Sequence, residues 1–320
     1  MKSDIAKSMS IRAKINNFAK ANGISPQHAM QSFFAERFLA RIEKSKYVKN
    51  LAIKGGALMS DILGIAKRTT MDVDATIIGM HADEEVIKRI VAEVAATDVG
   101  DGIVFEANLS EPGAITKDDD YGGYSIGMHA LLGTIRLPIG IDLTFGDIIT
   151  PKAERRRFST MLDDKTKITV LAYTVETIIA EKLQTVLKRG AANTRPRDYY
   201  DLYMLSELGG YQINTLKTAV ANTFRNRHSE VYLKDWRKII SAVADSEAMV
   251  AQWKRYQSNA PYTKGIAFVE LIAAVEHFFE EITKCHRIFP NFSNSRCYSP
   301  LASVGHLRSC APIAPSAHPN

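Results

Sequence analysis

Apolar side chains recur at two different spacings along the first 145 residues, and each spacing predicts a different kind of element. From Ile11 to Lys46 they fall three or four positions apart, which is typical of helices. Leu51-Ala52-Ile53 is a short apolar run that ends at a diglycine and predicts a strand. We expect next a helix over Ala57–Leu63, a strand through Val73 and a helix over roughly Glu84–Val94.

Strand-like segments continue as far as Phe145, and helical spacing dominates after Asp163-Asp164. The first part predicts an α/β (α+β) fold, with N-terminal helices and one mixed β-sheet over residues 1–165. An apolar stripe through Val175, Ile179 and Val186 begins a helical domain that we expect over 166–284. The later strand-like stretches lie within 103–107, 124–130 and 134–145, and the later helices within 198–208, 214–223, 234–244 and 265–279.

From about Cys285 onward the composition of the 320-residue chain changes. This part holds all three cysteines, Cys285, Cys297 and Cys310, is rich in Ser and Pro, and shows no sustained period. The cysteine spacing matches no tight zinc motif, so we expect a disordered tail over 285–320 rather than a metal site. A body without cysteine, a polar N-terminus and the lack of an apolar run near ~20 residues together predict a cytoplasmic protein.

The net charge of +6 and the pI near 9.0 are compatible with a polyanionic partner but do not identify one. Runs of basic residues commonly mark solvated loops, and in an enzyme acting on RNA they also provide a track for its backbone. The clusters are Lys152/Arg155/Arg156/Arg157, Arg195/Arg197 and Arg225/Arg227/His228.

The pair Asp72-x-Asp74 carries the clearest chemical signal in the chain. Residues i and i+2 of a strand face the same way, so both carboxylates project together while Val73 turns to the core. Two like charges so close repel each other unless a cation lies between them, and hard ions such as Mg²⁺ take oxygen ligands. The alternative is a solvated strand end with two surface aspartates, because the pair alone is a weak signal.

A third carboxylate, Asp142, stands between Ile141 and Leu143 on a predicted strand. A charge among residues that favour burial is unusual. Asp142 could lie on the outward face of an alternating edge strand. Together with Asp72 and Asp74, however, it offers a three-carboxylate site that suits two Mg²⁺ ions acting on a triphosphate and an incoming hydroxyl.

The diglycine Gly55-Gly56 fits the same chemistry. Without Cβ atoms, these residues let backbone N–H groups approach phosphate oxygens at the start of the following helix. The G-x-x-x-x-G-K-[ST] pattern of a P-loop is absent. Arg68 is a candidate phosphate contact, although a surface role is commoner for a single arginine.

Four ordered motifs give a more specific resemblance. Gly-Gly, a short helix and Arg-Thr-Thr-x-Asp-x-Asp resemble the start of DNA polymerase β-like nucleotidyltransferases. All four motifs together resemble the AbiEii/AbiGii family of bacterial toxins, the nucleotidyltransferase half of abortive-infection systems. Met71 departs from the pattern, because relatives often have Lys or Arg there. The motifs are Arg68-Thr69-Thr70-Met71-Asp72-Val73-Asp74, Ile139-x-x-Asp142-Leu143-x-x-Gly146, Lys182-Leu183-Gln184-Thr185-Val186-Leu187-Lys188-Arg189 and Asp198-Tyr199-Tyr200-Asp201.

The resemblance implies site roles for individual residues. Asp72, Asp74 and Asp142 are implied to bind two Mg²⁺ ions, with Mn²⁺ as an alternative. Asp198 and Asp201 share a helix face, and the sequence leaves open which of them acts and whether it orients Lys182 or the acceptor hydroxyl. The residues implied in catalysis are Asp72, Asp74, Asp142, Lys182 and Asp198. Those implied in nucleotide binding are Gly55, Gly56, Arg68, Thr69, Lys182 and Arg189.

The resemblance also implies a function. We expect a Mg²⁺-dependent toxin of a toxin–antitoxin system active in phage defence. It would transfer a nucleotide from an NTP to an acceptor, foremost the 3′ end of tRNA, and release pyrophosphate. An AbiEi-like antitoxin is the implied protein partner. Two alternatives stay open: modification of a protein or small molecule, and a non-catalytic nucleotide- or RNA-binding protein of the same fold.

Overall fold

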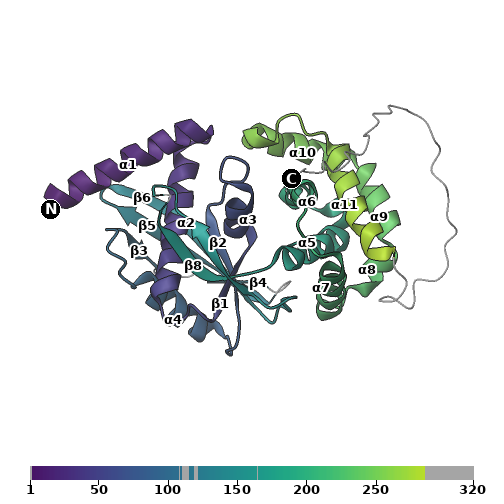
Figure 1. Cartoon of the computed structure of the whole chain (residues 1–320), viewed down its shortest axis with the longest axis horizontal. Coiled ribbons are helices and arrows are strands. Elements are labelled where there is room, and N and C mark those ends of the chain that lie inside the picture. The colour runs from purple at the N-terminus through teal and green to yellow at the C-terminus, as the bar shows by residue number, and fades with distance from the viewer. Residues whose placement is uncertain (1, 108, 110–114, 119–121, 164, 285–320) are drawn as a thin grey trace, which may run out of the picture.

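The structure is a computed structural model that describes residues 2–107, 109, 115–118, 122–163 and 165–284. It forms two neighbouring parts, a sheet with helices α1–α4 and a set of helices α5–α11 (Figure 1). The tail expected to be disordered, with its three cysteines, lies outside the described residues. Among the described helices, none is both long and apolar enough to span a bilayer.

Eight strands form one mixed sheet in the described part of the chain. Seven of them follow the order β3-β5-β6-β2-β1-β8-β7, and β4 pairs with β5. The pairs β2–β6 and β1–β8 are parallel, while the other pairs are antiparallel. The strands are β1 (Leu51–Lys54), β2 (Asp72–Ile77), β3 (Val104–Glu106), β4 (Ile115–Asp118), β5 (Gly123–Leu132), β6 (Ile135–Phe145), β7 (Glu154–Ser159) and β8 (Lys167–Ala172).

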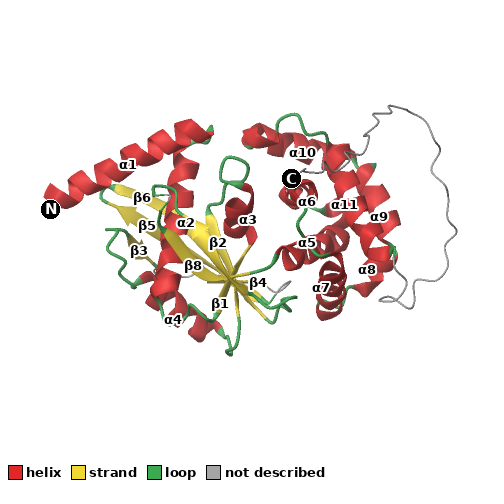
Figure 2. Ribbon diagram, in the orientation of Figure 1, coloured by secondary structure: helices red, strands yellow, loops and turns green. Residues whose placement is uncertain are grey.

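Helices of the N-terminal part cover the sheet and complete its core (Figure 2). The helix α2 (Pro26–Lys44) packs on β2, β6 and β8 and buries Phe34 and Phe38 completely or nearly so. It is separated from α1 (Lys2–Asn22) because Gly23 has φ +65° and Ser25 caps the second helix just before Pro26. The helices α3 (Gly55–Leu63) and α4 (Glu84–Ala95) agree with the sequence prediction to within two residues.

The strands β7 and β8 continue the sheet, and β8 lies beyond the predicted boundary at residue 165. Ile168, Val170 and Ala172 of β8 are buried, and β8 pairs in parallel with β1. The cluster Arg155-Arg156-Arg157, which could have been a loop, lies on the edge strand β7. The helical part therefore begins with α5, directly after the sheet.

The helical part holds the four later predicted helices and further elements that the apolar pattern did not indicate. Its first helix, α5, packs against α6 and α7, and α11 packs against α6 and α9. The helices are α5 (Val175–Arg189), α6 (Pro196–Leu208), α7 (Ile213–Asn226), α8 (Glu230–Lys234), α9 (Trp236–Ala244), α10 (Glu247–Asn259) and α11 (Phe268–Thr283), with 3₁₀ turns at Gly190–Ala192 and Pro261–Thr263.

Candidate active site

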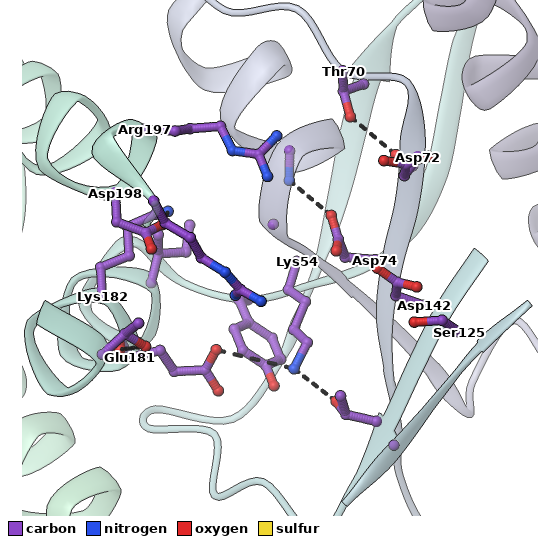
Figure 3. A pocket seen from close by; sticks show the side chains of 18 of the residues that line it. Lys54, Thr70, Asp72, Asp74, Ser125, Asp142, Glu181, Lys182, Arg197 and Asp198 are labelled. Atoms are coloured by element: carbon purple, nitrogen blue, oxygen red, sulfur yellow. Dashed lines mark hydrogen bonds and ion pairs between the residues drawn. The ribbon is translucent and has the colours of Figure 1, made fainter. Parts of the chain in front are cut away.

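A cavity of about 230 Å³ lies where the sheet meets α5 and the start of α6 (Figure 3). Its walls combine side chains from both parts of the chain, so neither part forms it alone. Most of the candidate site residues that the sequence singled out line it. They are Gly55, Gly56, Arg68, Asp72, Asp74, Asp142, Lys182 and Asp198.

One row of side chains crosses four adjacent strands along the cavity wall. Asp74 on β2 lies opposite Asp142 on the parallel strand β6. On the outer sides, Lys54 of β1 lies opposite Asp74 and Ser125 of β5 lies opposite Asp142. Directly paired residues project to the same face of a sheet, and all four line the cavity. The row therefore has the Lys54 ammonium at one end, the two carboxylates in the middle and the Ser125 hydroxyl at the other end.

Backbone N–H groups hold the first two aspartates in place. Asp72 accepts a hydrogen bond from the N–H of Gly140 at 3.1 Å, and Asp74 accepts one from the N–H of Gly56 at 2.9 Å. Glycine is required for both close approaches. A Cβ on Gly140 would lie 2.6 Å from Oδ1 of Asp72, and a Cβ on Gly55 would lie 2.1 Å from Oδ2 of Asp74. Gly55 also has φ +56°, which favours glycine.

The electrostatics of this wall favour a cation. Burial, and after it the charge of Asp74, raises the pKa of Asp72. Three carboxylates are hard oxygen donors of the kind that Mg²⁺ takes, so the donor set fits a divalent ion. Among the described residues, however, no three His, Cys, Asp or Glu side chains converge as a preformed ligand shell. Asp72 and Asp74 instead each bind a different backbone N–H, which separates their charges.

A buried chain of ion pairs connects the sheet side to α5 and α6. Lys182 Nζ lies 2.8 Å from Oδ1 of Asp198 and 2.8 Å from Oδ2 of Asp201. Asp201, fully buried, also accepts from Nε of Arg68 at 2.9 Å. Burial lowers the pKa of Lys182, but the two carboxylates outweigh it and the net shift is upward. Both members of the Asp-x-x-Asp motif thus orient Lys182.

Arg68 lines the cavity, but its side chain is almost fully enclosed. Its side chain is 3% exposed, its Nε binds Asp201, and its Nη1 donates to the carbonyl of Thr69. Thr69 does not line the cavity, whereas Thr70 does and donates to the backbone carbonyl of Asp72 at 3.0 Å. Arg189, at the end of α5, does not line the cavity either. Seven residues of helix put it roughly 10 Å along the axis from Lys182.

A second ion cluster borders the cavity on the Lys54 side. Lys54 Nζ lies 2.8 Å from Oδ2 of Asp147 and 2.6 Å from the hydroxyl of Thr144. Arg227 of the helical part contacts Asp147 at 3.2 Å and Glu181 at 2.9 Å. Burial raises the pKa of Asp147, but Lys54 and Arg227 outweigh it and hold the pKa well below the usual range. This cluster is a second link between the sheet and the helices.

Several cavity residues were not assigned to the site from the sequence. Arg195 and Arg197 stand exposed at its edge, and within the described residues neither has a carboxylate partner within ion-pair distance. The only indication in the sequence that they belong to the site was their position just before Asp198. Lys54 directly precedes the diglycine, so its position was the available clue. Arg227 stood in the basic cluster Arg225/Arg227/His228, and Ser125 gave no sign, because the neighbours of both residues come from distant parts of the chain.

Known proteins similar to this chain include solved structures and a protein family. No curated protein matches the chain. Two solved structures from Helicobacter pylori are similar to it, each with a TM-score of 0.45. A protein provisionally described as a nucleotidyltransferase is 13% identical, with 82% of this chain and 98% of that chain covered. JHP933 is 12% identical, with 81% of this chain and 95% of that chain covered.

A match to a protein family covers most of the described chain. Residues 37–280 match the family described as "Nucleotidyl transferase AbiEii toxin, Type IV TA system". This span begins within α2 and ends within α11, so it contains the whole sheet and every side chain that lines the cavity. The chain therefore belongs to the AbiEii family of nucleotidyltransferase toxins.

Proposed function

We propose that this protein transfers a nucleotide from an NTP to the 3′ end of tRNA, and that an AbiEi-like antitoxin counters it in phage defence. The observation that carries the transferase site is the pairing of Asp74 with Asp142 on adjacent parallel strands, beside the diglycine turn. A site that only bound nucleotide would gain nothing from crowding carboxylates next to phosphates, because like charges repel.

Asp72, Asp74 and Asp142 would together hold two divalent ions, Mg²⁺ in the first place. Bound there, the ions would neutralise the carboxylates and stabilise the negative charge of the triphosphate. The raised pKa of Asp72 supports this assignment. Burial and the charge of Asp74 both disfavour the ionised form of Asp72, and a neighbouring cation would stabilise that form.

Cationic side chains on the opposite wall would bind the triphosphate. Lys182 has three N–H donors, and Asp198 and Asp201 take two of them, which leaves one for a phosphate oxygen. Arg195 and Arg197 stand at the cavity edge and suit bidentate contact with phosphate. Arg68, enclosed and bound to Asp201, would act as a positioning residue.

In the transfer step, an acceptor hydroxyl oxygen attacks the α-phosphorus of the NTP. The bond from this phosphorus to the bridging oxygen breaks, and pyrophosphate leaves. Asp142 would accept the proton of the hydroxyl, since it faces the cavity next to Asp74. Lys182 and the arginines would hold the charge that develops on the leaving group.

Incubation of the pure protein with each labelled NTP and total cellular RNA tests the proposal. We expect one NTP to label RNA of tRNA length, with release of pyrophosphate, and Asp74→Ala to abolish both. Label in protein or in a small molecule would instead favour a different acceptor. NTP binding without pyrophosphate release, under any divalent ion tried, would favour the non-catalytic alternative.

A further inference from the structure

Ser125 closes the row of cavity side chains on the side away from Lys54. It lies on β5 directly opposite Asp142, and Figure 3 shows the two side by side at the cavity wall. Cβ atoms of directly paired antiparallel residues are about 4.5–5.5 Å apart. A serine hydroxyl at this position is within reach of the Asp142 carboxylate. Ser125 has no part in the proposed transfer to RNA.

Ser125 differs from the other hydroxyls of the cavity lining. Thr70, Thr144 and Thr185 each bond to a neighbouring group, and Tyr173 is buried against Thr76. Tyr124 projects to the opposite face of β5, where its ring stacks on Phe145 at 6.4 Å. Ser125 is exposed, and in the described part of the chain its hydroxyl has no hydrogen-bond partner.

The described residues leave room on the face of β5 next to Ser125. Gly127 is the next residue on this face, and a Cβ built on it would meet no atom of the described residues within 4 Å. Its partner across the strands, Gly140, likewise has no side chain. Ser125 therefore lines the cavity next to the carboxylates of Asp142 and Asp74, in the place where an acceptor hydroxyl would approach.

We propose that Ser125 is a self-modification site, where the protein attaches a nucleoside monophosphate to its own hydroxyl when no RNA acceptor is bound. The Oγ atom of Ser125 forms a bond to the α-phosphorus of the NTP, and the bond to the bridging oxygen breaks. Pyrophosphate leaves, and the proton of the hydroxyl passes to Asp142 and then to water. The product blocks the acceptor side of the cavity, so the modified toxin is inactive.

This inference rests on the proposed nucleotidyltransferase activity, and its test separates the two. Full-length protein is incubated with each NTP without RNA and its intact mass is measured, while a parallel reaction contains total RNA. We expect the mass of one nucleoside monophosphate to be added, and peptide mapping to place it on Ser125. The modified protein should lose transfer to RNA in proportion to the modified fraction, and added pyrophosphate should reverse the modification.

Variants fix the site of attachment. Ser125→Ala should take up no nucleotide, Ser125→Thr should keep a measurable part, and Ser159→Ala, an exposed serine on β7, should behave as the unaltered protein. Labelled RNA together with an unmodified protein, or with modification at another residue, overturns the inference and leaves the proposed function standing. Absence of label from both RNA and protein overturns the proposed function, and this inference with it.

Discussion

Nε of Arg68 lies 2.9 Å from Oδ1 of Asp201, although the two residues are 133 positions apart in the chain. Arg68 precedes the strand that carries Asp72 and Asp74, and Asp201 lies on α6 in the helical part. The same carboxylate contacts Lys182 at 2.8 Å. One buried side chain therefore fixes both the sheet side and the helix side of the cavity.

Asp201→Asn should destabilise the protein strongly, because it leaves two enclosed cations without their shared counter-charge. Breaking a buried ion pair from one side costs about 3–5 kcal/mol. Asp198→Asn should cost much less, since Asp198 is 13% exposed and contacts Lys182 alone. Urea denaturation of both variants measures the difference. Equal losses would show that Asp201 has no special structural role.

The elements around the aspartates could be predicted from the sequence, because their signals are local. The diglycine ends an apolar run, and the alternation of Asp72, Val73 and Asp74 fixes which side chains face together. The strand β8 escaped prediction because it is stabilised by pairing with β1, more than a hundred residues earlier. The polar run of β7 resembles a loop, since an edge strand is supported from one side only.

The partners of the charged residues could not be predicted for a similar reason. Lys182, which the family resemblance assigns to the phosphates, lines the cavity, but its two carboxylate contacts depend on how α5 packs on α6. Arg189 shares a face with Lys182 on a helical projection, yet the axial rise places it outside the cavity. A shared helix face therefore does not show that two residues line the same cavity.

Asp72→Asn should abolish nucleotide transfer and raise stability at neutral pH. The pKa of Asp72 is raised in the folded protein. The folded protein therefore binds the Asp72 proton more tightly than the unfolded chain does. The charged form therefore costs stability, and the cost appears as the pH rises from about 4, the ordinary pKa of aspartate, through the higher folded value. Urea midpoints measured at pH 4 and pH 7 should show a gain for the variant at pH 7.

The control for this comparison is Asp245→Asn, an exposed aspartate at the end of α9. The urea midpoint of this variant should differ little from that of the unaltered protein at pH 4 and at pH 7. Full transfer by Asp72→Asn would remove Asp72 from the set of metal ligands.

Gly55→Ala should eliminate transfer, because the new Cβ would lie 2.1 Å from the carboxylate of Asp74. Gly23→Ala is a matched control. Its φ of +65° is close to the +56° of Gly55, but a Cβ there meets nothing within 4 Å. The backbone strain, about 1–2 kcal/mol, is then common to both variants. Loss of activity in Gly55→Ala alone, with similar thermal stability, assigns the effect to displacement of Asp74.

Reversing Arg155 and Arg157 to Glu should weaken RNA binding and make it less dependent on salt, while NTP affinity stays unchanged. Both side chains are solvent-facing on β7, whereas Arg156 is bound to Asp61 at 2.7 Å and is left intact. Each lost phosphate contact should lower the slope of log K against log salt by roughly 0.7 for a single strand. Filter binding over a range of salt concentrations measures this slope for the variant and for the unaltered protein. An unchanged slope would place the RNA on another surface.

Lys182→Met should lower kcat/KM for the NTP by about 10²–10³-fold, the usual effect of removing one donor that stabilises developing negative charge. Arg189→Met on the same helix should change it little, because Arg189 lies outside the cavity. RNA affinity should survive in both variants, since its phosphate contacts are spread over many basic residues. Removing Lys182 also leaves Asp201 with one cation instead of two, so kinetics are compared only at temperatures where both variants are folded. If Lys182→Met kept its transfer kinetics while RNA affinity collapsed, α5 would be an RNA-binding helix and the triphosphate would depend on Arg195 and Arg197.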